Sequence, residues 1–186
     1  MPSLRGVVIG DSQVKFMCRS RLPLKPSVKT CTFSYAGFDA VRMAEAVSAM
    51  RFQRVDFAIL YVGGNDLANV NAEPQEICDN IGELVLQLQH DVAPIVYVFK
   101  VLPRCFNPKD ADAERKTRKA RLLNRKLTAA LKRWPCVRIL NAEVRLRRHE
   151  NAVPSWSALC DRIRVAAGSS AAALELFQAS TSLFMP

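Results

Sequence analysis

The sequence contains little histidine and no clustered cysteine. Two histidines occur in 186 residues, and the six cysteines are scattered without any Cys-x-x-Cys pair. Zinc sites are built from such ligands at short spacings, so we predict no metal site. Scattered thiols in an intracellular chain are expected to stay reduced and to pack as small hydrophobic groups. The thiols belong to Cys18, Cys31, Cys78, Cys105, Cys136 and Cys160.

Long apolar runs are also missing, and none approaches the length that crosses a membrane. Residues 1–5 lead directly into an apolar strand pattern, without the basic segment, apolar segment and cleavage site of a secretory signal. We therefore expect an intracellular protein, cytoplasmic or nuclear. Its 49% of hydrophobic and 24% of charged residues are ordinary for a globular chain, so disorder is not expected. The length predicts a single domain over residues 1–186.

Acidic residues are in the minority, since 17 Asp and Glu stand against 27 Lys and Arg, for a formal net charge of +10. A basic balance favours anionic partners such as nucleic acid. The positive charge is concentrated in 110–133, a stretch with helical spacing and few acids to neutralise it through i,i+4 pairs. The candidate nucleic-acid contacts in this stretch are Arg115, Arg118, Lys119, Arg125 and Lys126.

Short apolar runs alternate with amphipathic stretches along the chain. The runs are rich in β-branched and aromatic residues and predict strands at 7–9, 30–35, 55–62, 94–102 and 137–140. Helical spacing of apolar residues predicts helices at 13–22, 39–50, 74–89, 110–133 and 169–183. Five alternations of strand and helix predict an α/β fold, a three-layer flavodoxin-like domain with a mostly parallel five-stranded sheet.

Candidate functional residues follow three of the predicted strands directly. Ser12 follows the first strand, Gly37 the second and Asn65 the third. The carboxyl ends of parallel strands share one edge, where open α/β sheets bind their ligands, so we expect these residues in one crevice. A serine nucleophile needs donors aimed at the oxyanion of acyl transfer, and the N–H groups of Ser12 and Gly37 and the Asn65 amide would supply them. A plain turn followed by a helix cap is the other explanation of Gly10-Asp11-Ser12.

Three motifs carry a resemblance to the SGNH, or GDSL-type, hydrolase family. They are Gly10-Asp11-Ser12, Tyr35-Ala36-Gly37 and Gly63-Gly64-Asn65-Asp66. The resemblance covers essentially the whole chain and is nearest to the esterase-like domains of mobile-element-derived proteins. It implies a serine esterase fold that cleaves small carboxylic esters through a seryl intermediate. It also implies that Ser12 is the nucleophile, that Gly37 and Asn65 complete the oxyanion hole, and that no cofactor is needed.

The final block of the family, Asp-x-x-His, falls on residues 161–164. Asp161 occupies the aspartate position, whereas Arg164 stands where the family has its catalytic histidine. An arginine side chain stays protonated in proteins and cannot accept the serine proton. We therefore predict a weak or silent nucleophile, with Arg164 paired to Asp161. His149 is the other candidate base, and His90 is expected at the opposite edge of the sheet.

The sequence leaves rival functions open. A serine ester hydrolase, catalytically active or silent, is the leading hypothesis. The alternative is a non-catalytic module on the same scaffold that binds nucleic acid or another anion, and a third hypothesis is an interaction domain of a larger protein. A general assay of ester hydrolysis separates the first hypothesis from the other two.

Overall fold

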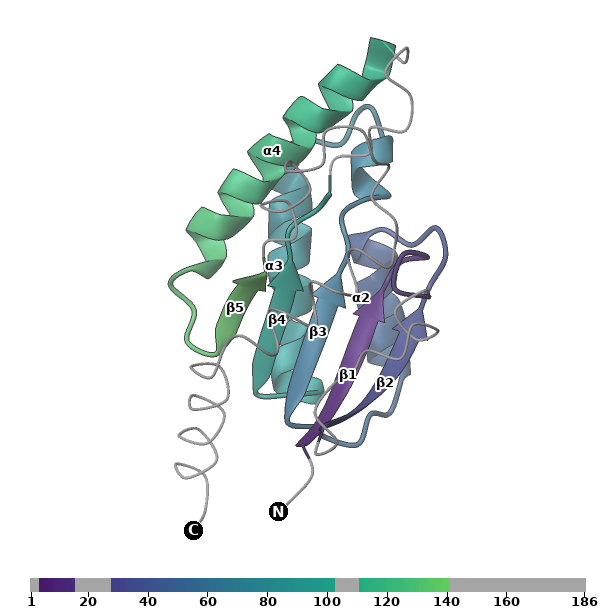
Figure 1. Cartoon of the computed structure of the whole chain (residues 1–186), viewed down its shortest axis with the longest axis vertical. Helices are drawn as coiled ribbons and strands as arrows, with labels where there is room; N and C mark the ends of the chain where they lie inside the picture. Colours follow the sequence, from purple (N-terminus) through teal and green to yellow (C-terminus); the bar gives the residue numbers. More distant parts are fainter. Residues whose placement is uncertain (1–3, 16–27, 103–110, 141–186) are drawn as a thin grey trace.

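The computed structural model describes residues 4–15, 28–102 and 111–140, whose strands form one five-stranded sheet. All neighbouring strands are parallel, in the order β2-β1-β3-β4-β5 (Figure 1). This is the order of flavodoxin-like domains, so the predicted α/β fold is confirmed. The strands are β1 (Leu4–Gly10), β2 (Val28–Ser34), β3 (Phe57–Tyr61), β4 (Ile95–Phe99) and β5 (Val137–Leu140).

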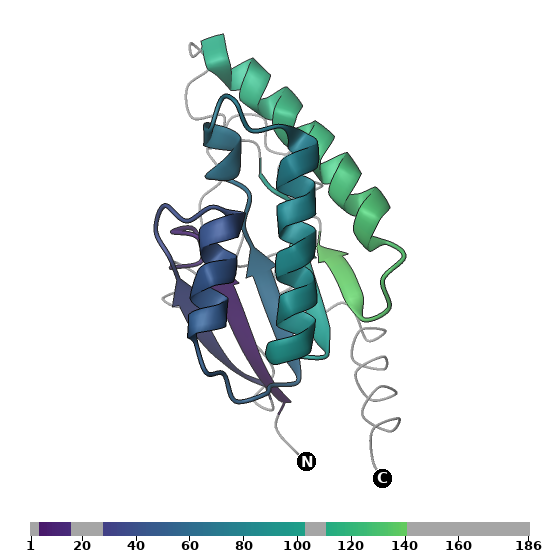
Figure 2. The ribbon, with the colours of Figure 1, turned by 180° about the vertical axis from the view of Figure 1, so that it is seen from behind.

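Helices pack on one face of the sheet, where α2 and α3 cover the strands and α4 lies beside α3 (Figure 2). They confirm three predicted helices, with small shifts at the ends, whereas the short 3-10 helix η1 has no counterpart among the predictions. The helix predicted at 169–183 lies outside the described residues, as does most of the one at 13–22. No described helix is both long and apolar enough to span a membrane. The elements are α2 (Ala40–Ala49), η1 (Asp66–Ala68), α3 (Pro74–Asp91) and α4 (Ala111–Leu131).

Strand β1 shows why unbroken apolar runs form the centre of the sheet. Successive side chains of a strand point to opposite faces, so Val7 and Ile9 pack with the helices while Val8 packs on the other face. All three are buried, as is every residue of β3. Central parallel strands are covered on both faces, and their sequences are therefore continuously apolar rather than alternating.

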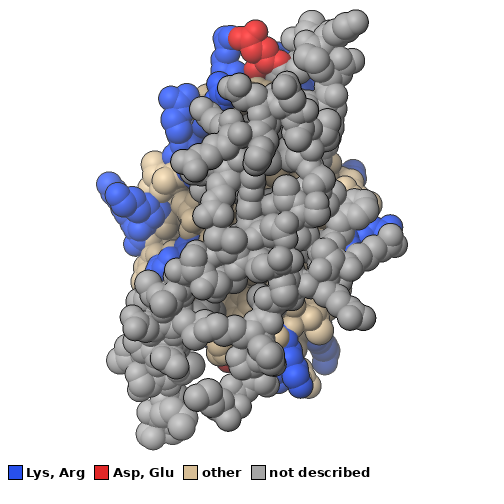
Figure 3. Space-filling model, in the orientation of Figure 1, with Lys and Arg blue, Asp and Glu red and all other residues tan. Residues whose placement is uncertain are grey.

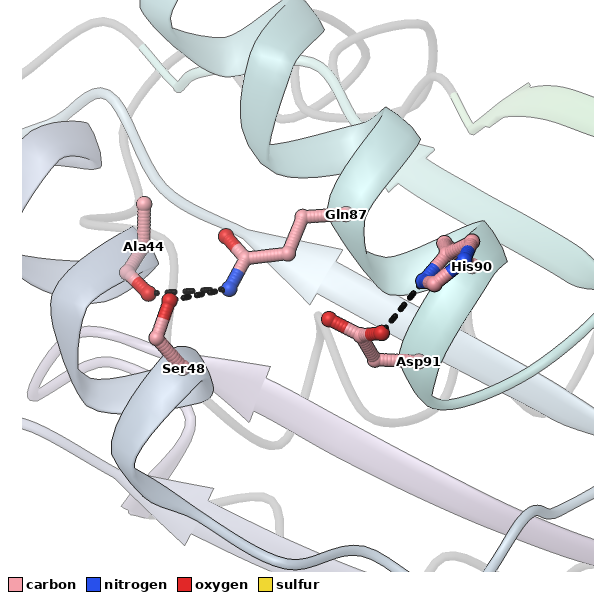
Figure 4. Close-up of polar contacts among 5 residues, drawn as sticks. All are labelled: Ala44, Ser48, Gln87, His90 and Asp91. Atoms are coloured by element: carbon pink, nitrogen blue, oxygen red, sulfur yellow. Dashed lines mark hydrogen bonds and ion pairs between the residues drawn. The ribbon is translucent and has the colours of Figure 1, made fainter.

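Helix α2 begins at the predicted cap and packs on α3. The Asp39 carboxylate accepts the N–H of Arg42 at 2.9 Å, which satisfies a first-turn donor. Polar contacts add to the packing, since Gln87 Nε2 donates to the Ala44 carbonyl at 3.2 Å and to Ser48 Oγ at 2.6 Å (Figure 4). These contacts join α2 to α3.

Helix α3 ends at the amino edge of the sheet. The N–H of Val55, just before β3, donates to the carbonyl of Val92, just after α3, at 2.9 Å. His90 lies in the last turn of α3, exposed and bonded to Asp91 at 2.5 Å (Figure 4). Because Ser12 follows the carboxyl end of β1, His90 lies at the opposite edge, as the sequence predicts.

The described thiols differ from the expected burial. Cys78 on α3 is buried, and this burial raises the pKa of its thiol. Cys31 and Cys136 are free and exposed, so the prediction of burial is wrong for them. Cys31 lies on the edge strand β2, and Cys136 lies in the turn before β5 with a φ of 63°, so both positions have a side open to solvent.

Candidate active site

The chain leaves β1 through Gly10 at a point too crowded for a side chain. A Cβ placed on Gly10 would lie 2.5 Å from the carbonyl oxygen of Tyr61 and 2.6 Å from Val14 Cγ1. The carbonyl of Gly10 accepts the N–H of Tyr35 at 2.9 Å, and the N–H of Asp11 donates to the Tyr61 carbonyl at 3.2 Å. The end of β1 is therefore joined through the backbone to the ends of both neighbouring strands.

Asp11 shapes the turn that presents Ser12. Its side chain is fully buried, and its Oδ1 accepts the N–H of Gln13 at 2.8 Å in an Asx turn. Its carbonyl accepts the N–H of Val14 at 3.1 Å and the hydroxyl of Ser34 at 3.0 Å. These bonds hold the backbone on both sides of Ser12, whose own side chain remains partly exposed.

Gly37 lies in the turn after β2 and has a left-handed backbone conformation, with a φ of 78°. In the part of the chain that the structure describes, no heavy atom apart from those of its chain neighbours lies within 4 Å of a Cβ placed there. Within residues 4–15, 28–102 and 111–140, no hydrogen bond uses the N–H of Ser12 or of Gly37. Both groups suit an oxyanion hole, which needs donors that the fold itself does not consume.

Asn65 follows β3 and contacts the turn after β2. Its Nδ2 donates to the Phe38 carbonyl at 2.8 Å, which orients the amide. Strands β1 and β3 are neighbours, yet the chain proceeds from β1 to β2 on one side and from β3 to β4 on the other. Open α/β sheets bind ligands at such a switch point, and Ser12 and Asn65 flank it.

Asp66 is a buried carboxylate to which the sequence analysis assigns no separate function. It is 7% exposed, and its Oδ1 accepts the N–H of Ala40, the first residue of α2, at 3.1 Å. Burial raises the pKa of Asp66, the nearby Asp39 and Asp11 carboxylates add to the rise, and the Ala40 hydrogen bond opposes it. Asp66 ties η1 to α2 and so positions the loop of Asn65. Its place directly after Asn65 in the motif is the signal that points to this function.

Replacing Asp66 by asparagine is expected to remove a pH dependence of stability. The folded state raises the pKa of Asp66 above its ordinary value of 3.8, so the folded state binds the proton more tightly than the unfolded state does. The contribution of this group to the free energy of unfolding therefore falls as the pH rises above about 4. Asparagine keeps an oxygen for the Ala40 N–H and does not ionise.

Urea unfolding at about pH 4 and about pH 7 measures this effect. The difference in the free energy of unfolding between the two pH values should be smaller for Asp66→Asn than for the parent chain. Asp79→Asn, on the exposed side of α3, is the matched control and should leave the difference unchanged. Equal differences in all three proteins would show that Asp66 does not carry the dependence.

The structure places Ser12, Gly37 and Asn65 on adjoining loops at the carboxyl edge of the sheet. Hydrogen bonds between the backbone and side chains of these loops join them into one unit. Among the described residues, no three His, Cys, Asp or Glu side chains group as metal ligands would. The remaining predicted site residues lie outside the described part of the chain, namely Asp161, Arg164 and His149.

Some basic side chains of α4 contact other parts of the protein, whereas others are exposed. Lys119 donates to the carbonyl of Asn69 at 2.8 Å, and Lys126 donates to Gln75 Oε1 at 2.7 Å. Both lysines therefore reach across to the loop and first turn that precede and begin α3. The exposed candidates for nucleic-acid contact are Arg115, Arg118 and Arg125.

Comparisons with family models and with curated proteins give no match for this sequence. Solved structures do share its fold. A lipolytic protein of the G-D-S-L family from Veillonella parvula superposes with a TM-score of 0.68 and 10% identity, covering 91% of this chain and 98% of the other. This chain has the GDSL hydrolase fold. The α/β fold with a mostly parallel five-stranded sheet that the sequence predicts is confirmed.

Further structures with the GDSL fold are similar to this chain. An acetylxylan esterase from Geobacillus stearothermophilus has a TM-score of 0.60 and 11% identity over 89% of this chain and 94% of its own. A GDSL-like lipase from Bacteroides thetaiotaomicron has a TM-score of 0.59 and 16% identity over 74% and 68%. At identities this low, a structural likeness establishes the fold alone. The activity therefore has to be argued from the residues of the site. The relation to mobile-element proteins stays a prediction.

Proposed function

We propose that this chain is a serine ester hydrolase with Ser12 as its nucleophile. The observation that supports this most is the hydrogen-bonded set of loops that carries Ser12, Gly37 and Asn65 at one edge of a GDSL fold. Proteins with the same fold include a lipase and an acetylxylan esterase. The proposed substrate is a carboxylic ester, and the proposed reaction uses no metal or organic cofactor.

Hydrolysis proceeds through an acyl-enzyme. Ser12 Oγ attacks the carbonyl carbon of the ester, a C–O bond forms, and the carbonyl π electrons move onto the carbonyl oxygen. The N–H groups of Ser12 and Gly37 and the Asn65 amide donate hydrogen bonds to that oxyanion. The intermediate then expels the alcohol and leaves an ester on Ser12, which water cleaves. The serine proton must leave Oγ and reach the departing alcohol, so the reaction needs a base.

The base is the weak part of this site. Arg164 stands at the histidine position of the final block, and a guanidinium has no lone pair that could take the serine proton. We propose that Arg164 pairs with Asp161 and leaves the site without a base. A serine site in this condition keeps only what its oxyanion hole contributes, which is a small part of the rate of a complete triad. The proposed native activity is therefore slow ester hydrolysis.

The native chain is expected to hydrolyse a short-chain aryl ester at a rate close to background. It is also expected to react slowly with a serine-directed phosphonate, because an unactivated hydroxyl is a poor nucleophile. Intact-mass measurement after long incubation should show one phosphonate adduct on the native chain and none on Ser12→Ala. Peptide mapping assigns the adduct to Ser12.

Two outcomes would contradict parts of this proposal. Labelling or turnover that survives in Ser12→Ala would show that Ser12 is not the nucleophile. Fast turnover that depends on Ser12 in the native chain would show that Arg164 does not silence the site, and His149 would then be the residue to replace.

A polyanion-binding module on the same scaffold is the alternative to hydrolysis. A nucleic acid needs several cations that are free to follow its phosphate backbone. Two of the candidate cations, Lys119 and Lys126, are instead bonded to protein oxygens. Trp134, the aromatic residue nearest to the basic stretch, packs against the core that α3 helps to form. These contacts favour the hydrolase over the polyanion-binding module.

A further inference from the structure

A groove lies between α4 and the segment that joins η1 to α3. Its volume is about 280 Å³, and α4 contributes its amino-terminal half to one wall. Figure 1 shows this half of α4 above the carboxyl ends of the strands, and Figure 3 shows Lys and Arg side chains along the edge that α4 forms. The groove therefore belongs to the edge of the sheet that carries the candidate active site.

Leu67 links the groove to the loop that carries Asn65. Leu67 lines the groove and lies two residues after Asn65. The N–H of Leu67 donates to the carbonyl of Gly63 at 3.1 Å, so it belongs to the same tight turn as Asn65. One wall of the groove and the loop of Asn65 are therefore parts of the same turn.

Lys119 supplies the groove with a fixed positive charge. Its Nζ donates to the carbonyl of Asn69 at 2.8 Å and lies 3.5 Å from that of Val70. Carbonyl oxygens hold the ammonium in place but carry no formal charge, so the charge of Lys119 is not neutralised. Among the described residues that line the groove, Glu73 is the one acid, and basic side chains outnumber it.

Arg118 contributes less to the field in the groove. It is paired with Glu114 at 2.8 Å, in an i,i+4 pair whose two side chains are 80% and 83% exposed. Exposed pairs of this kind are weak but reduce the net charge that a ligand meets. Lys119 is therefore the counter-charge that a ligand in the groove would meet in a fixed position.

Apolar surface accompanies this charge. Val70 and Leu122 line the groove and are 62% and 39% exposed, and they are two of the four large apolar side chains that stay exposed in the described part of the chain. Leu67 is buried beneath them. Exposed apolar side chains gathered around a cation suit a ligand that is apolar along its length and anionic at one end.

We propose that this groove selects ester substrates whose far end carries a carboxylate or phosphate. The inference rests on the proposed ester hydrolysis and names its substrate class. The apolar segment of the substrate lies on Val70 and Leu122, its anionic end pairs with Lys119, and its ester carbonyl reaches the Asn65 loop. Lys119 is thus a specificity-determining residue rather than a catalytic one.

A matched pair of esters tests this inference without turnover. Monoethyl adipate and ethyl hexanoate have the same chain, and the first has a carboxylate where the second has a methyl group. Both are titrated by NMR into isotopically labelled Ser12→Ala protein, and the methyl signals of Val70 and Leu122 are followed. Monoethyl adipate is expected to shift these signals and to bind about tenfold more tightly than ethyl hexanoate.

Variants of α4 locate the effect. Lys119→Gln keeps a donor for the Asn69 carbonyl and removes the charge, so it should weaken monoethyl adipate binding about tenfold and leave ethyl hexanoate binding unchanged. Lys132→Gln removes an exposed charge just after the carboxyl end of α4 and should change neither affinity. Ethyl phosphate, titrated in the same way, distinguishes a phosphate preference from a carboxylate preference.

Several results would overturn the inference. Equal affinities for the two esters, or an affinity for monoethyl adipate that Lys119→Gln does not lower, would remove the groove as a selective site. A short uridine oligonucleotide that displaces monoethyl adipate and loses affinity equally in Lys119→Gln and Lys132→Gln would show a polyanion surface instead. Because binding is measured in Ser12→Ala, failure of the groove leaves the proposed hydrolysis untouched, and failure of Ser12 labelling leaves the groove untouched.

Discussion

Arg164→His is expected to raise the hydrolysis of a short-chain aryl ester by about 10²–10⁴-fold over the native chain, which is the usual contribution of a positioned general base. The imidazole supplies the lone pair that the guanidinium lacks, and Asp161 would hold it in the productive tautomer. Arg162→Gly is combined with it, because Arg162 follows Asp161 where the GDSL-type motif that this block resembles usually has a small residue. Initial rates at about pH 8, above the ordinary pKa of histidine, measure the gain.

Three controls isolate the cause of this gain. Arg162→Gly alone should stay at the native rate, since it adds no base. Arg145→His places a histidine at another arginine ahead of the final block and should also stay at the native rate. Arg164→His combined with Ser12→Ala should return to background. A histidine variant that remains folded and gains no activity would show that residue 164 does not face Ser12.

Asn124→Leu is expected to lower the free energy of unfolding by about 2–5 kcal/mol. Asn124 Oδ1 accepts the N–H of Val101 at 2.8 Å, and its Nδ2 donates to the carbonyl of Val101 at 2.8 Å. Asn124 is 5% and Val101 1% exposed. Leucine would leave both backbone groups of Val101 buried without partners, at about 1–3 kcal/mol for each.

Urea unfolding followed by circular dichroism measures this loss. Arg125→Leu makes a similar exchange one residue later on the exposed side of α4, and it should change the free energy of unfolding by no more than about 0.5 kcal/mol. A loss for Asn124→Leu as small as that of Arg125→Leu would mean that the clamp on Val101 does not stabilise the fold. The clamp joins Val101, which follows β4, to the middle of α4.

Local sequence patterns predict an element well where a single feature decides it, such as a buried apolar run or a helix cap. The run at 55–62 contains β3 because every residue of that strand is buried on both faces. Asp39 caps α2 because a carboxylate before a helix accepts a first-turn N–H. The predicted strand at 7–9 is shorter than β1, because Arg5 and Gly6 are not an apolar pattern. Pairing with β2 extends the strand through both residues.

Some features of the candidate site are predictable from the sequence, and others are not. Ser12, Gly37 and Asn65 are predictable because each follows a strand directly, and parallel strands bring their carboxyl ends to one edge. The burial that raises the pKa of Asp66 is not visible in the sequence, since it depends on the neighbouring loops and the start of α2. The basic helix is predictable from composition, whereas the contacts that divide its side chains are not.

The sequence alone determined the α/β fold class, the motifs and their common edge. The periodicity and the turn residues that indicate these features act between near neighbours in the chain. Tertiary structure alone decided three contacts, between residues 50, 23 and 26 positions apart. Lys119 meets the loop before α3, Asn124 clamps Val101, and Asp66 meets Ala40. Such contacts depend on which surfaces the packed helices bring together, and the groove exists only where α4 crosses the end of η1. Burial and charge in that groove arise from the packing of distant segments, which no local pattern encodes.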